Sequence, residues 1–125
     1  MRNLFAGLPW AKLVECPWQS WAQFRRTIGS MDLAMQPSFT ETFNIVSADA
    51  VAEGVPSIVS HAVEWAPESW KAHPDDIAGM VRIGCALLAS PAAPAEGLRA
   101  LEAHGERAIA VWKGYLSRNP AAIQR

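Results

Sequence analysis

The chain has 125 residues, of which 50% are hydrophobic and 18% charged, and its formal net charge is −1. This composition fits one folded, soluble domain and argues against wholesale disorder. The absence of a basic block argues against a nucleic-acid binder, and no apolar run reaches the roughly 18–20 residues that a transmembrane helix needs.

The first half of the chain predicts helices and short strands in alternation. Ser20 is placed to cap one helix, Gly29 to end it, and Gly54 to end the next. The last strand of this half has no charged residue and is assigned to the continuous apolar type, which is typical of a sheet covered on both faces. In order, the predicted elements are a helix over 3–8, a strand over 12–15, a helix over 19–30, a strand over 31–35, a helix over 44–53 and a strand over 56–60.

The second half predicts a loop over 61–68 and a fourth, short strand over 69–72. Asp75 or Asp76 then caps a helix that ends near Ala89. A linker over 90–94 leads into a long final helix over 95–116, and the residues after it are expected to fray. The buried stripe of the first of these two helices is predicted from apolar spacing to comprise Ile77, Met80, Val81, Gly84 and Leu88.

This alternation predicts one α/β unit over residues 1–125. We expect a Rossmann-like parallel sheet of about four strands, flanked by helices and followed by a long C-terminal helix. In such sheets, ligands bind where the strands end and the following helices begin. The segment after the second strand is therefore the first place to look for chemistry.

The helix that begins at Asn44 presents unpaired N–H groups and a positive dipole end, which suit a phosphate. The expected donors are the amides of Asn44, Ile45 and Val46. Asp49 lies among apolar residues, so its carboxylate needs a partner such as a pair of ribose hydroxyls, unless it faces solvent. Glu41, eight residues earlier, can reach a sugar hydroxyl at the start of the helix; the alternative is a solvated loop carboxylate.

This stretch resembles the donor-binding signature of retaining glycosyltransferases with two Rossmann-like domains, the GT-B type (group 1, family 4-like). Glu41 and Asp49 have the spacing of its two acidic residues, and Gly54-Val55-Pro56 followed by an apolar strand supplies the rest. Pro37-Ser38 and Pro74-Asp75 agree with the flanking order. Two positions depart from the family: Asp49 is one methylene shorter than the usual Glu, and Asn44 replaces a glycine.

The resemblance implies that this unit binds a nucleotide-diphosphate sugar and is a partial C-terminal domain of a transferase. It implies that Glu41 contacts the transferred sugar, Asp49 the ribose, and the amides of residues 44–46 the diphosphate or sugar. Glu15 to Trp18 would lie near the base. Transfer would proceed with retention, without a metal or other cofactor, by stabilising the leaving diphosphate.

The same resemblance implies that an N-terminal acceptor-binding domain is missing, so that the isolated chain is inactive. We expect a cytoplasmic protein, which can be membrane-peripheral in the full-length enzyme. His61, after the third strand, either faces the ligand or is an ordinary loop residue. Cys16 and Cys85 suggest no disulfide framework or metal site, and Cys85 is expected to be buried.

Two other functions remain open. The chain can be a non-catalytic module that forms a homodimer through a sheet edge or apolar surface. A small flavodoxin-like regulatory domain would need an acidic pocket after the first strand, which Glu15 and Cys16 supply poorly.

Six tryptophans are many for this length, and they belong either to core and rim packing or to a ligand site or interface. They are Trp10, Trp18, Trp21, Trp65, Trp70 and Trp112.

Overall fold

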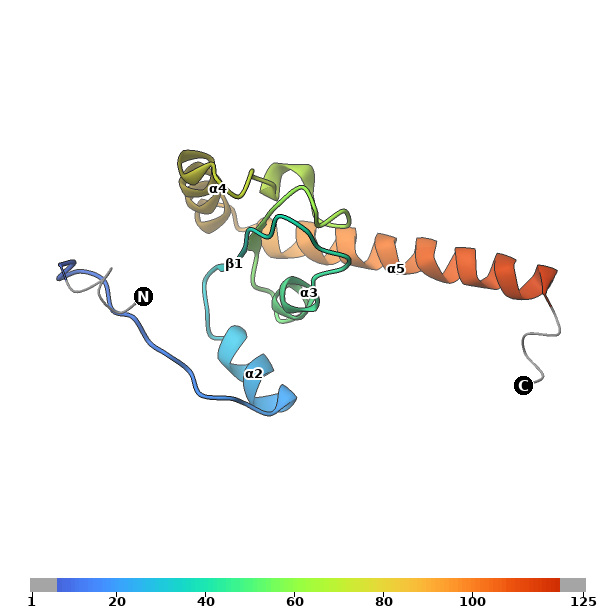
Figure 1. Cartoon of the computed structure of the whole chain (residues 1–125), viewed down its shortest axis with the longest axis horizontal. Helices are drawn as coiled ribbons and strands as arrows, with labels where there is room; N and C mark the ends of the chain where they lie inside the picture. The colour runs from blue at the N-terminus through green and yellow to red at the C-terminus, as the bar shows by residue number, and fades with distance from the viewer. Residues whose placement is uncertain (1–6, 120–125) are drawn as a thin grey trace.

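The computed structural model describes residues 7–119. It is a mixed α/β unit in which a short sheet lies between helices and a long C-terminal helix extends away from the body (Figure 1). The predicted helix over 3–8 falls mostly outside the described residues, as do the last six residues of the chain. The elements are α2 (Trp21–Ile28), β1 (Ala34–Gln36), α3 (Ile45–Ala52), β2 (Ser57–Val59), η1 (Glu68–Trp70), α4 (Ile77–Ala89) and α5 (Ala93–Arg118).

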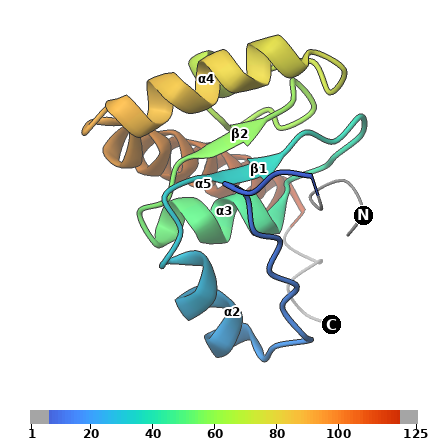
Figure 2. The ribbon, with the colours of Figure 1, turned by 90° about the vertical axis from the view of Figure 1, so that its left-hand side faces the viewer.

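The sheet consists of β1 and β2, which pair in parallel with Ala34 opposite Ser57 and Gln36 opposite Val59. Figure 2 shows α3 on one face of these strands and α4 on the other. The predicted parallel sheet, its covering helices and the long final helix are therefore present. Of the four predicted strands, two form among the described residues, and β1 is shifted toward the C-terminus because the Met31 amide instead donates to the Ile28 carbonyl at the end of α2.

The predicted strand over 12–15 is wrong. Residues 11–20 have no regular structure, and Val14 is 67% exposed. Figure 1 shows this segment running apart from the body before it enters α2. A strand is stable only when a neighbour accepts and donates its backbone hydrogen bonds, and within residues 7–119 the sheet consists of β1 and β2 alone.

The predicted strand over 69–72 is wrong in its first half. Residues Glu68–Trp70 form a turn of 3₁₀ helix, in which the Trp70 amide donates to the Pro67 carbonyl. The chain is extended only from Lys71, which forms a single parallel bridge with Val59. The turn places the whole Trp70 side chain, which is 0% exposed, in the core.

The helix boundaries follow local capping chemistry. Ser20 accepts a hydrogen bond from the Gln23 amide, while the Gln23 side chain accepts from the Ser20 amide, so a capping box starts α2 as expected. Asp76 caps α4 by accepting from the Gly79 amide at 2.8 Å. Helix α5 starts two residues earlier than predicted, because Pro94 is tolerated within a first helical turn.

The predicted buried stripe of α4 is mostly wrong. The residues of α4 that pack inward are Gly79, Ile83, Gly84 and Leu87, whereas Ile77, Val81 and Leu88 are 72%, 61% and 58% exposed. Cys85 is also exposed, against expectation. The sheet is too narrow to cover the whole apolar face of this helix, so the exposed residues line an open apolar hollow of about 490 Å³ beside β1.

The core lies between the sheet, α3, α4, the 61–72 segment and the start of α5. Two of the six tryptophans belong to it, Trp65 and Trp70; the other four are exposed. A second, smaller cluster fastens α2 to α3 and contains Ile28, Ala50 and Val55. Both clusters therefore pack against α3, and the predicted ligand site lies at the start of this helix.

No single helix among residues 7–119 is both long enough and apolar enough to cross a bilayer. Helices α4 and α5 meet those limits only when they are taken together, and they are bent by 105° relative to each other.

Candidate functional site

The link between β1 and α3 is organised by Asn44. Its backbone has a φ of +61°, in the left-handed region, which asparagine tolerates better than most residues. Asn44 is 6% exposed, and its side chain makes two hydrogen bonds, one as an acceptor and one as a donor. Oδ1 accepts from the Ser47 amide at 2.9 Å, which caps α3, and Nδ2 donates to Oε2 of Glu41 at 3.0 Å.

These bonds hold the Glu41 carboxylate in one orientation. Its second oxygen, Oε1, accepts from the Thr42 amide at 3.2 Å. Each oxygen keeps a further lone pair, and the residue is exposed, so the carboxylate can still accept from a ligand. Glu41 is thus a loop carboxylate that the loop itself positions.

The same loop is anchored to the rest of the fold through Phe43. The indole Nε1 of Trp65 donates to the Phe43 carbonyl. The Phe43 ring packs against Trp65, with ring centroids 6.1 Å apart, and against His104 of α5, with centroids 5.6 Å apart. His104 of the last helix therefore contacts the loop that precedes α3.

Two hollows meet at the start of α3, and both are lined by Ile45 and Val46. The smaller, of about 370 Å³, is also lined by Glu41, Asn44 and the residues between them. The larger, of about 600 Å³, is also lined by Asp49 and by aromatic side chains of α2 and the segment before it. The amides of Ile45 and Val46 have no backbone or side-chain acceptor among residues 7–119, because the first helical bond is donated by Ala48 and the cap satisfies Ser47.

The predicted ligand residues divide between these hollows. Asp49 is half-buried in the wall of the larger one, and no described residue pairs with its carboxylate. Trp18, which is 99% exposed, lines the same hollow together with Trp21, whose ring lies 4.9 Å below the Arg25 guanidinium. Glu15 lines neither hollow; Cys16 takes its place at the wall.

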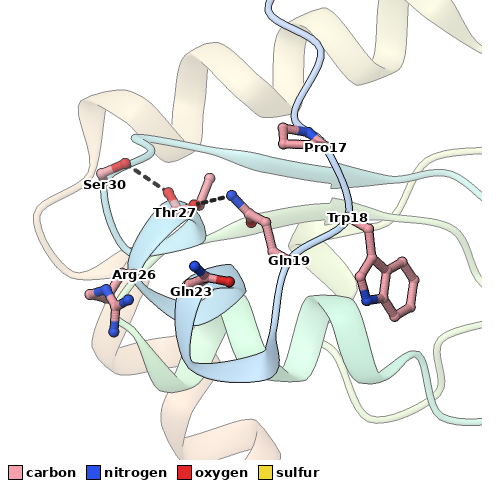
Figure 3. Close-up of a pocket in the computed structure, with 7 residues that line it drawn as sticks. All are labelled: Pro17, Trp18, Gln19, Gln23, Arg26, Thr27 and Ser30. Carbon is pink, nitrogen blue, oxygen red and sulfur yellow. Dashed lines mark hydrogen bonds between the residues drawn. The ribbon is translucent and has the colours of Figure 1, made fainter.

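A third, polar hollow of about 470 Å³ lies on the other side of residues 17–19 (Figure 3). Gln19 crosses it and donates to the Thr27 hydroxyl at 3.0 Å. In Figure 3 the indole of Trp18 points away from Gln19 and Thr27. This bond joins the segment before α2 to the end of α2 and so limits where Trp18 can lie.

The other titratable side chains singled out from the sequence have local roles. His61 lies 3.3 Å from Glu68, which also pairs with Lys71 at 3.1 Å. The hydrogen bond and charge of Lys71, followed by the charge of His61, hold the pKa of Glu68 below its ordinary value of 4.5. Among the described residues, no group of three or more His, Cys, Asp or Glu side chains has an arrangement that could hold a metal.

Two parts of this site are not among the expectations from sequence. Asn44 is expected as an amide donor, although an Asn directly before a helix is also a recognisable cap. Trp21 and Phe24 complete the larger hollow through the contact between α2 and α3, which joins segments far apart in the chain. No local signal in the sequence specifies that contact.

Replacing Asn44 with alanine is expected to lower the free energy of unfolding by about 2–3 kcal/mol, through a lost cap and a strained left-handed residue. Glycine at the same position also lacks the cap but accepts the backbone angle, so Asn44→Gly is expected to cost about 1 kcal/mol. Urea unfolding of both variants measures the difference. Equal losses would show that the backbone angle contributes nothing.

Comparison of the chain with family models, with curated proteins and with solved structures finds no match.

Proposed function

We propose that this chain binds the nucleotide-diphosphate sugar donor of a retaining glycosyltransferase, as part of a longer GT-B type enzyme. The observation that carries the proposal is the meeting of two hollows at the free amides of Ile45 and Val46, with one acidic side chain in each hollow. A donor of this class has three chemically different parts, and the surface around α3 has a suitable group for each.

The diphosphate fits the start of α3. Two N–H groups there have no acceptor within residues 7–119, and the helix dipole adds a partial positive charge. Because transfer leaves negative charge on the diphosphate, donors that are already in place stabilise that charge as it develops. Glu53 at the other end of α3 is paired with Arg25, so that carboxylate is neutralised by a nearby charge.

The nucleoside fits the larger hollow. Exposed tryptophan rings offer a face on which a base can stack, and Trp18 and Trp21 present two such rings. The half-buried Asp49 carboxylate accepts hydrogen bonds only, so two ribose hydroxyls would supply the donors that it lacks. The sugar would then extend toward Glu41, in the smaller hollow on the other side of the amides.

A titration with UDP-, GDP- and ADP-sugars tests the proposal by the shift in melting temperature. A donor present at 100 times its dissociation constant is expected to stabilise the fold by about 2.7 kcal/mol. The variant Asp49→Ala should abolish this shift while leaving the ligand-free chain folded. Asp32→Ala removes an exposed carboxylate that precedes β1, at the other end of the sheet from the start of α3, and should leave the shift unchanged.

Inorganic pyrophosphate separates a donor site from a simple anion site. If pyrophosphate gives the same stabilisation as every nucleotide sugar, and Asp49→Ala leaves both unchanged, the start of α3 binds anions without recognising a nucleoside. No stabilisation by any of the nucleotide sugars would also contradict the proposal.

A further inference from the structure

The outer half of α5 makes few contacts with the body. The inner half is packed, with Ala93 and Gly97 buried and His104 against Phe43. By contrast, residues 106–113 are all exposed, and Figure 1 shows this half of the helix extending beyond the rest of the molecule. Isolated helices shorter than about 12–15 residues are only marginally stable in water. The exposed half of α5 would therefore gain stability by packing against another surface.

This outer half has an apolar stripe with the spacing of a helix–helix seam. Ile109, Trp112 and Leu116 follow one another at intervals of three and four residues, which places them on one face. Ile109 is 55% exposed and Trp112 is 64% exposed. The Trp112 ring packs edge-on against Tyr115 of the same helix, with centroids 6.0 Å apart, and this contact leaves much of its surface uncovered.

Charges beside the stripe indicate what covers it. Glu106 and Lys113 are seven residues apart, so they lie on the same flank of the stripe, two turns from each other. They are equally far from the midpoint between residues 109 and 110. A second α5 that runs antiparallel across this midpoint therefore brings each glutamate level with a lysine of the other copy. In a parallel arrangement the flanks that carry these charges would lie on opposite sides of the seam, so neither charge would meet a partner of opposite sign.

We infer that the outer half of α5 is a homodimer interface, in which the α5 helices of two copies pair antiparallel about a two-fold axis between residues 109 and 110. Trp112 of each copy packs against Ile109 of the other, and two symmetric Glu106–Lys113 pairs flank this seam. In a two-fold interface, residue i of one copy contacts residue j of the other, and residue j contacts residue i in return. Glu106 and Lys113 carry opposite charges, so both of these contacts are attractive. This inference does not depend on the proposed donor site, because the stripe lies on the projecting part of α5.

Sedimentation equilibrium of the full chain, over a wide range of concentration, tests the inference. The wild-type chain is expected to show a reversible monomer–dimer equilibrium. Glu106→Lys replaces two attractive pairs by two repulsive ones and should raise the dimer dissociation constant about tenfold. Lys113→Glu should do the same, and an equimolar mixture of the two variants should restore wild-type affinity, because each then offers the charge that the other lacks.

Arg107→Glu is the matched control, since it reverses a charge next to Glu106 but on the opposite face of the helix. It should leave the dissociation constant unchanged, and circular dichroism should show the same helix content for all variants. A wild-type chain that stays monomeric throughout overturns the inference. So does a dimer that Glu106→Lys leaves as stable as before, or one that Arg107→Glu weakens equally.

Discussion

Replacing Trp70 with alanine is expected to lower the free energy of unfolding by about 4 kcal/mol, close to the whole stability of a marginal domain. The side chain is 0% exposed and belongs to the main core cluster. It lies where η1, β2 and the start of α5 meet, so its removal leaves a cavity that several elements line. Chemical denaturation monitored by far-UV circular dichroism measures the loss.

The conservative variant Trp70→Phe separates packing from hydrogen bonding. The indole Nε1 of Trp70 is buried and has no hydrogen-bond acceptor among the described residues. Phenylalanine removes that donor while it keeps an aromatic ring in place, so the expected loss is about 1–2 kcal/mol, well below that of alanine. If phenylalanine costs as much as alanine, the indole nitrogen has an acceptor that the structure does not show.

The second large effect concerns Gly97, in the first half of α5. Glycine-to-alanine changes within helices usually stabilise by about 1 kcal/mol. At Gly97, however, an added Cβ would overlap the buried indole of Trp70. Because that ring is held on all sides, α5 must shift, and Gly97→Ala is expected to destabilise the fold by about 2–3 kcal/mol, as overpacking does.

Gly105→Ala is the matched control, since a Cβ there meets no atom within 4 Å. It is expected to stabilise the helix by up to about 1 kcal/mol. Thermal unfolding of the two variants should therefore move the melting temperature in opposite directions. A shift of the same sign for both would show that the contact between Gly97 and Trp70 does not limit how closely α5 packs.

The contact between Gly97 and Trp70 also bears on the candidate site. It places the inner half of α5 against the core, and His104, seven residues further along this helix, packs on Phe43. Phe43 lies in the loop that connects Glu41 with Asn44. A shift of α5 would therefore displace the loop at the start of α3, which lies more than fifty residues before Gly97 in the chain.

The helices could be predicted because their signals are local. Ser20 and Asp76 cap the helices expected to follow them, and Gly54, with a φ of +81°, ends the α3 region as predicted. The position of the strands depended on pairing. The 12–15 segment is predicted as a strand, yet it forms no strand pairing among the described residues and remains irregular.

The candidate site was predicted in part for the same reason. Glu41, Asn44, Ile45 and Val46 lie within six residues of chain, so a loop followed by a helix start brings them together. Asp49 joins them because it is one turn further along α3. The resemblance implies that Glu15 lies near the base, after a strand that does not form, and Glu15 lines neither hollow.

By itself, the sequence determined the α/β class, the capped helices and the acidic residues around the start of α3, since caps, periodicity and short spacings act between near neighbours. Only the tertiary structure decided which apolar faces are covered. It buried Trp70 and left Ile77, Val81 and the outer half of α5 exposed. An apolar stripe specifies that a helix should pack, but the partner and the covered area depend on how many other elements reach it, and here a two-stranded sheet covers only part of what the stripes offer.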